Sequence, residues 1–196
     1  MATTRENKSI SDFKSALIGG GARPNLFEVE LTTLPGGITW DADNFRYMCK
    51  AASLPASTIA NIDVPFRGRI FKVAGDRTID VWSVTVINDE DFKLRNAFEE
   101  WMNIIAKLDN NLGATQPESY MTNAKVYQLG RGSTKSSTSN TGDANVVLKE
   151  YEMIDIFPTS VSAIDLSYDT GDTIEEFTVE FQVQSFSLVG AGSPNG

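Results

Sequence analysis

The segment that decides the fold is residues 173–188, TIEEFTVEFQVQSFSL. Its apolar side chains occupy alternate positions, and polar side chains fill the positions between them: Phe177, Val179, Phe181 and Val183 against Thr178, Glu180, Gln182 and Gln184. Successive side chains of a β-strand point to opposite faces of a sheet. The segment therefore predicts a long strand with one face in a core and the other face polar.

The same two-residue period recurs through most of the chain. It is clear from residue 26 onward, where Phe27, Val29 and Leu31 alternate with glutamate and threonine. A turn at residues 75–76 predicts a hairpin, and the prolines at positions 55 and 65 are typical of an edge strand. The full set of further expected strands is 26–32, 38–49, 54–65, 70–73, 78–87, 146–157 and 161–168.

One segment has helical spacing instead. Its apolar residues recur every three or four positions and form a single stripe: Leu94, Phe98, Trp101 and Ile105. Such a stripe is typical of a helix that packs on a core, and Asn88 or Asp89 is expected to cap its first turn. Many short strands with one helix predict a mainly β fold, an antiparallel β-sandwich or barrel with one flanking α-helix.

The chain is expected to form one domain, residues 22–189, between two polar ends. Residues 1–21 end in three glycines and are expected to form a flexible arm, with a flexible tail over residues 190–196. Residues 130–145 are rich in Ser, Thr and Gly and are expected to form an exposed loop. Neither a secretory signal nor a run of roughly 20 apolar residues is visible, so no stable membrane association is expected. The lone Cys49 fits a cytoplasmic folding compartment.

The net charge of −9 is concentrated near the C-terminal end. Up to residue 149 the chain carries 17 basic and 17 acidic side chains, and the nine carboxylates beyond that point have no lysine or arginine among them. This disfavours a protein that grips nucleic-acid phosphates, because that class needs a basic patch. A solvated acidic surface that aids solubility is the plainest interpretation. A separate basic group lies far from this acidic quarter in sequence: Arg67, Arg69, Lys72 and Arg77.

Residue types that most catalysis needs are absent. There is no histidine, which removes the commonest general base and metal ligand, and a single cysteine excludes thiolate zinc sites. Glu175 and Glu176 do not form an acid–base pair by themselves, since neighbours on a strand point to opposite faces. Asp169 and Asp172, around a glycine, are more typical of a hairpin turn than of a calcium site. We therefore expect no enzyme activity, no cofactor and no metal.

Short sequence blocks occur in a fixed order between residues 22 and 186. They are ARPNLFEVE at 22–30, CKAASLPA at 49–56, VAGDRT at 73–78 followed by Trp82 and VINDE at 86–90, FPTSV at 157–161 and EEFTV at 175–179. Together they resemble the tail tube proteins of T-even-type contractile-tailed bacteriophages, which are related to the inner tubes of contractile injection systems. Residues 1–21, 130–145 and 190–196 depart from the family pattern as additions to it.

The resemblance implies a structural virion protein. Its β-sandwich or barrel subunits would assemble into hexameric rings, lend strands to a ring-shaped barrel, and stack into the inner tube through which DNA is ejected. The implied partners are other copies of the chain, the tail sheath protein, the baseplate and tail terminator proteins, the tape measure protein and transient DNA in the lumen. The implied location is the tail tube of the virion, after synthesis and assembly in the host cytoplasm.

Two groups of candidate residues follow from that resemblance. The polar faces of long strands would line the lumen, with Glu28, Glu30, Glu176 and Glu180 as the candidates. Their charge would keep DNA from adhering to the wall within about one Debye length, ~8 Å at physiological salt. The basic group Arg67, Arg69, Lys72 and Arg77 is the candidate subunit or ring contact, and a plain surface role stays open for it.

Two alternatives belong beside this interpretation. The inner tube of a non-viral contractile injection system would share the architecture and carry protein in place of DNA. A glycan-binding or hydrolytic β-sandwich would instead be a monomer with a ligand groove. Polymerisation separates this last class from both kinds of tube.

Overall fold

The computed structural model describes residues 9–17, 21–130, 146–169 and 171–189. The expected loop after residue 130, the expected C-terminal tail and parts of the expected N-terminal arm lie outside the described residues.

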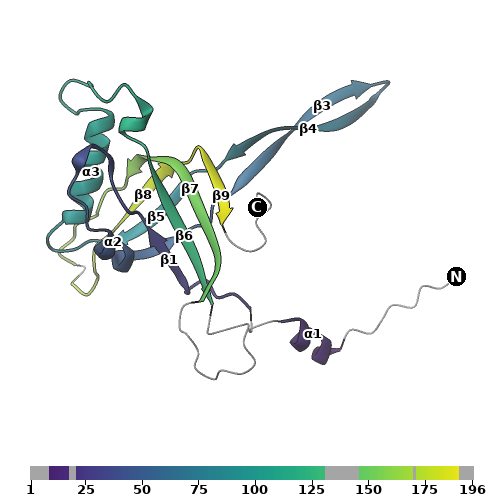
Figure 1. Ribbon diagram of the computed structural model, residues 1–196, viewed down its shortest axis with the longest axis horizontal. Coiled ribbons are helices and arrows are strands. Elements are labelled where there is room, and N and C mark those ends of the chain that lie inside the picture. Colours follow the sequence, from purple (N-terminus) through teal and green to yellow (C-terminus); the bar gives the residue numbers. More distant parts are fainter. Residues whose placement is uncertain (1–8, 18–20, 131–145, 170, 190–196) are drawn as a thin grey trace.

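A seven-stranded antiparallel sheet forms the body of the protein (Figure 1). Its strands are β1 (Phe27–Glu30), β2 (Cys49–Ala52), β5 (Trp82–Ile87), β6 (Thr122–Gly130), β7 (Val146–Val161), β8 (Glu176–Gln182) and β9 (Ser185–Val189). They lie in the order β1-β6-β7-β8-β5-β2, and β9 pairs with β7 beside β8. The end strands β1 and β2 contact each other, so the sheet curls around one core. This confirms the predicted mainly β, antiparallel fold.

An aromatic cluster fills the core. Phe98 is fully buried at its centre, and five rings surround it with centroids 5.4–6.5 Å away: Trp40, Phe45, Trp101, Phe177 and Phe181. Aromatic pairs at these separations add to the stabilisation that comes from burying their area. The rings come from helices, strands and a loop, so this cluster ties the elements of the body together.

Helix α3 (Lys93–Ile105) covers the core with the predicted stripe, since Leu94, Phe98 and Trp101 are all buried. The predicted cap is wrong. The residue before the helix is Phe92, with left-handed backbone angles, and no side chain caps the first turn. Asn88 instead pairs with Glu175 of the neighbouring segment: its N–H donates to the Glu175 carbonyl at 2.8 Å and its Nδ2 to the carboxylate at 3.0 Å.

A second helix, α2 (Ala42–Met48), replaces the strand that was predicted over residues 38–49. The side chain of Asp41 caps it by accepting a hydrogen bond from the Asn44 N–H at 3.0 Å, and Phe45 is buried in the core. A cap and one anchoring ring suffice for a short helix that packs on a body. The alternation in this stretch therefore gave the wrong period.

The predicted hairpin was also wrong. Strands β3 (Ser57–Phe66) and β4 (Arg69–Ile79) pair only with each other, as a separate two-stranded sheet. Their turn is Arg67–Gly68, where both residues have positive φ, as the turns that suit tight hairpins require. Gly75 lies within β4 at a shift of register, where an added Cβ would approach the Ala60 carbonyl oxygen to 3.0 Å. A glycine inside a strand often marks such a close approach of backbones.

The C-terminal strands begin and end at other residues than predicted. β7 is a single strand of 16 residues that continues through Pro158, and the strand expected over residues 161–168 does not form. The strand expected over residues 173–188 is interrupted after Gln182, so its two parts, β8 and β9, pair with different stretches of β7. The buried side chains of β8 are those that the alternation predicted.

The third helix, α1 (Ile10–Ala16), lies in the expected N-terminal arm, with a capping box formed by Ser9 and Asp12. None of its residues is buried, and it lies apart from the body in Figure 1. The described residues thus contain three α-helices in place of the single predicted one. Among the described residues, no helix is long and apolar enough to span a membrane.

We predict that Phe98→Ala destabilises the body by about 3–5 kcal/mol, because it leaves a cavity at the centre of the aromatic cluster. Leu166→Ala is the matched control, since Leu166 is exposed and its loss should change stability by less than about 0.5 kcal/mol. Chemical denaturation followed by tryptophan fluorescence measures both changes. Equal stability of the two variants would contradict the packing described.

Candidate assembly interface

Strands β3 and β4, residues 57–79, form a hairpin that projects from the body into solvent (Figure 1). We call this hairpin the arm. Cross-strand pairs place Ile62 opposite Val73 and Val64 opposite Phe71, so these apolar side chains share one face. The other face carries an ion pair between Asp63 and Lys72, at 3.4 Å. The arm is therefore amphipathic except beside its turn, where Ile70 lies on the second face and Arg69 on the first.

The apolar face of the arm has no cover in the described structure. Its large side chains are all exposed, with Phe66 and Phe71 each at 66%: Ile62, Val64, Phe66, Phe71 and Val73. An isolated two-stranded hairpin is at best marginally stable in water. Contiguous apolar surface of this kind marks an interaction site.

The basic group predicted from sequence lies entirely on this arm. Arg67 is in the turn, where its guanidinium lies 5.4 Å from the centre of the Phe66 ring. Arg69, Lys72 and Arg77 lie along β4. The arm has four basic and two acidic side chains, a net charge of +2, so the rest of the chain carries −11. Charge of opposite sign is thus divided between the arm and the rest of the chain.

The four candidate lumen glutamates all lie on the side of the sheet that faces away from the core. In β1, Glu28 and Glu30 flank the buried Val29, and in β8, Glu176 and Glu180 alternate with buried side chains. These glutamates lie on two strands that β6 and β7 separate. We call this outer side of the sheet, as defined by the four glutamates, the polar face.

Basic side chains that sequence reasoning missed neutralise part of this polar face. Arg46 of α2 lies 2.9 Å from Glu28 (Nε to Oε1) and 3.7 Å from Glu30 (Nη2 to Oε1). Lys50 of β2 forms an ion pair with Glu176. Among the described residues, Glu180 forms no ion pair and remains exposed. The sequence holds no signal for these pairs, because the partners come from separate elements.

A tyrosine completes the network on β1 and β6. The hydroxyl of Tyr127 donates a hydrogen bond to Glu30 at 2.7 Å, and partial burial together with that carboxylate raises the pKa of Tyr127. Nearby, Lys125 lies 3.0 Å from Glu150, and this hydrogen bond raises the pKa of Lys125. Both shifts favour the protonated forms, so Tyr127 stays neutral and Lys125 stays positively charged at physiological pH.

The described residues contain no group of three or more histidine, cysteine or carboxylate side chains that could hold a metal ion. The lone Cys49 is partly enclosed, and burial raises the pKa of its thiol to about 12, so it is a poor nucleophile at neutral pH.

A sheet that curls around one core, an uncovered apolar arm and a polar outer face are together typical of a subunit of a larger assembly. The chain belongs to the phage tail tube family, because the family model described as phage tail tube protein matches residues 22–189. It is 38% identical over 161 residues to the tail tube protein gp19 of Enterobacteria phage T4, an alignment that covers 82% of this chain and 88% of that protein. The corresponding protein of Enterobacteria phage T6 gives the same figures.

Solved structures share the fold at low sequence identity. A chain of the anti-feeding prophage baseplate has a TM-score of 0.61 at 12% identity, covering 88% of this chain and 97% of that one. A chain of the sheath–tube complex of an extracellular contractile injection system has a TM-score of 0.54 at 13% identity, covering 94% of this chain and all of that one.

We predict that Tyr127 makes stability fall at high pH. Its pKa is raised in the folded protein, so its contribution is complete below the unfolded pKa of about 10 and declines as pH rises above it. Tyr127→Phe should therefore flatten the loss of unfolding free energy above pH ~10. Tyr168→Phe, at a fully exposed ring, should leave the wild-type profile unchanged. Identical profiles for the wild type and Tyr127→Phe would contradict this assignment.

Proposed function

We propose that the chain is the structural subunit of the inner tail tube of a contractile phage, in which hexameric rings stack into a conduit for DNA. The uncovered apolar face of the hairpin arm carries this proposal. Membership of the tail tube family and 38% identity to the T4 protein support the same role. The identity to phage proteins favours this role over the non-viral injection system, whose tubes share only the fold.

The arm acts as the element that joins copies. It is too slender to bury its own apolar side chains, and only another molecule can cover them. Its basic residues Arg67, Arg69, Lys72 and Arg77 then meet the acidic body of a neighbouring copy, so charge and apolar burial act together. Repetition of one such contact around a closed ring, and between rings, generates a tube.

The polar face lines the lumen in this proposal. Basic side chains form ion pairs with Glu28, Glu30 and Glu176, so they neutralise part of the negative charge of this wall. Glu180 contributes a carboxylate that forms no ion pair with the described residues. DNA carries one negative charge per ~1.7 Å of duplex axis. A wall of this kind repels the phosphates weakly and offers them no basic patch on which to bind.

The remaining roles follow from tube assembly. The partners are further copies of the chain, a tail sheath protein, baseplate and tail terminator proteins, a tape measure protein and transient DNA. The subunit is made and assembled in the host cytoplasm and ends in the virion. The chain is not an enzyme in this account, because neither the polar face nor the arm places a nucleophile beside a general base.

We predict that Phe71→Ser prevents assembly while leaving the body folded, because it removes a large side chain from the uncovered apolar face. Asn61→Ser, on the opposite face of the same arm, is the control and should assemble as the wild type does. Negative-stain electron microscopy of the purified proteins over a range of concentrations counts rings and tubes. A wild-type protein that stays monomeric even when seeded with baseplates would overturn the proposed function.

We also predict that Glu180→Lys slows DNA ejection at least several-fold while tubes still form. The new lysine binds passing phosphates, and an effect that weakens with added salt would identify its electrostatic origin. Glu180→Gln is the control, because it removes the charge without adding a phosphate-binding group. Real-time ejection from phage particles that carry each variant measures the rate. Normal ejection by the lysine variant would exclude Glu180 from the lumen wall.

A further inference from the structure

Helix α1 presents an apolar stripe that no other described part of the chain covers. Ile10 and Phe13 lie on one side of the helix, and Leu17 follows directly after its last residue; their exposed fractions are 75%, 63% and 44%. The helix precedes residues 22–189, the part that matches the tail tube family. It is therefore an addition to the shared domain.

This helix is too short to be stable by itself. Its seven residues span only ~10 Å, and isolated helices below about 12–15 residues are marginal in water. The capping box of Ser9 and Asp12 stabilises its first turn, but most helical stability in proteins comes from packing an amphipathic face. The stripe therefore needs a surface on which to pack.

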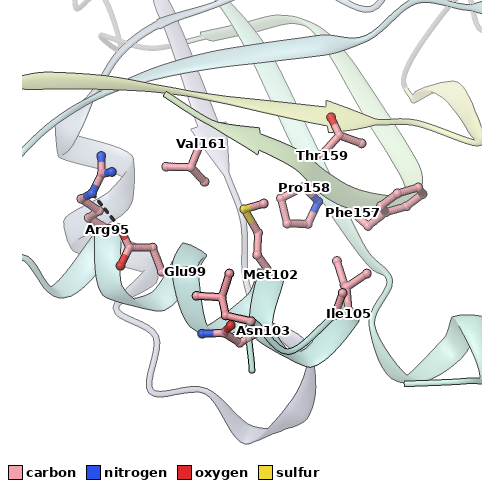
Figure 2. A pocket seen from close by; sticks show the side chains of 11 residues that line it. Arg95, Glu99, Met102, Asn103, Ile105, Phe157, Pro158, Thr159 and Val161 are labelled. Atoms are coloured by element: carbon pink, nitrogen blue, oxygen red, sulfur yellow. Dashed lines mark hydrogen bonds and ion pairs between the residues drawn. The ribbon is translucent and has the colours of Figure 1, made fainter. Parts of the chain in front are cut away.

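A matching apolar groove lies between α3 and β7 (Figure 2). It has a volume of about 510 Å³. Met102 and Ile105 of α3 form one wall, and Phe157, Pro158 and Val161 of β7 form the other. The stripe of α1 and this groove are therefore both apolar and both open to solvent.

Docking in the groove of its own chain would require the linker between the helix and the body to be almost fully extended. Arg23 is held beside β6, because its carbonyl accepts a hydrogen bond from Gln128 Nε2 at 2.9 Å. From Leu17 to Arg23 there are six Cα–Cα steps, which span at most ~22 Å. Gln128 pairs with Lys149, and Phe157, at the near end of the groove, lies eight residues further along β7, or ~26 Å.

Charge complementarity also favours a second copy of the chain as the occupant. Lys14 flanks the apolar stripe of α1, one helical turn from Ile10. Glu99 lies at the rim of the groove, half exposed and paired with Arg95 at 2.9 Å, as the dashed line in Figure 2 marks. When the helix lies in the groove, Lys14 comes close to the carboxylate of Glu99, and the groove covers the apolar stripe.

We propose that α1 of one subunit docks in the α3–β7 groove of another subunit and clasps the two together. The proposal rests on the proposed tube function. The helix is attached near the start of β7 and the groove lies near its end, so the contact is head-to-tail and repeats from subunit to subunit. Because the clasp is tethered, it acts at high effective concentration once the subunits are in place.

Disulfide trapping tests the clasp. In a Cys49→Ser background, Phe13→Cys is combined with Met102→Cys, and assembled tubes are oxidised with copper–phenanthroline. We expect a ladder of cross-linked subunits on a non-reducing gel. Ser11→Cys with Met102→Cys is the control, because Ser11 lies off the stripe, and it should cross-link at least ten-fold less. Tubes that form normally without a ladder, or with only cross-links inside one chain, would overturn the clasp and leave the tube function standing.

A second measurement separates docking from mere proximity. Phe13→Asp places a charge in the apolar groove and should raise the protein concentration needed for tube formation about ten-fold. Lys14→Ala should raise it less, and the monomer's thermal unfolding should be unchanged in both variants, because the residues of α1 are exposed. An unchanged assembly threshold for Phe13→Asp would contradict the proposal. If the wild-type chain forms no tubes, the proposed function and the clasp fall together.

Discussion

A two-stranded ribbon cannot bury its own apolar face, and the rest of this structure depends on that constraint. The hairpin arm holds Phe66 and Phe71 in open solvent, whereas the body encloses its own aromatic cluster around Phe98. Burial of apolar surface contributes roughly 25 cal/mol per Å² to the free energy of association, so a row of exposed apolar side chains favours binding to another molecule. In the proposed assembly, another copy of the chain completes the arm by covering this apolar face.

The charges of the molecule are also divided between the arm and the body. Basic residues gather on the arm, whereas the remainder of the chain is strongly acidic. The outer polar face is less negative than its glutamates suggest, because Arg46 and Lys50 reach across from α2 and β2 to neutralise three of them. In the proposed assembly, the net negative charge keeps free subunits apart in solution, and the basic residues of the arm guide it toward the acidic body of a neighbour.

Much of the body could be predicted from the sequence, because alternation in β1 and β8 and the stripe of α3 report directly on burial. The hairpin arm could not be delimited in this way. Gly75–Asp76 has the composition of a turn, yet it lies at a register shift inside β4. The actual turn is Arg67–Gly68, which stands among basic residues and lacks the usual composition of a hairpin turn. Alternation indicates that the four glutamates point away from the core, but their ion-pair partners depend on tertiary packing that no local pattern encodes.

The most direct test of the central claim is a helical reconstruction of assembled tubes by cryo-electron microscopy, at a resolution that separates side chains. The account predicts six subunits per ring, with Ile62, Val64 and Phe71 of every arm covered by a neighbouring copy. Tubes in which the apolar face of the arm remains open to solvent would contradict it, because assembly would then depend on some other contact.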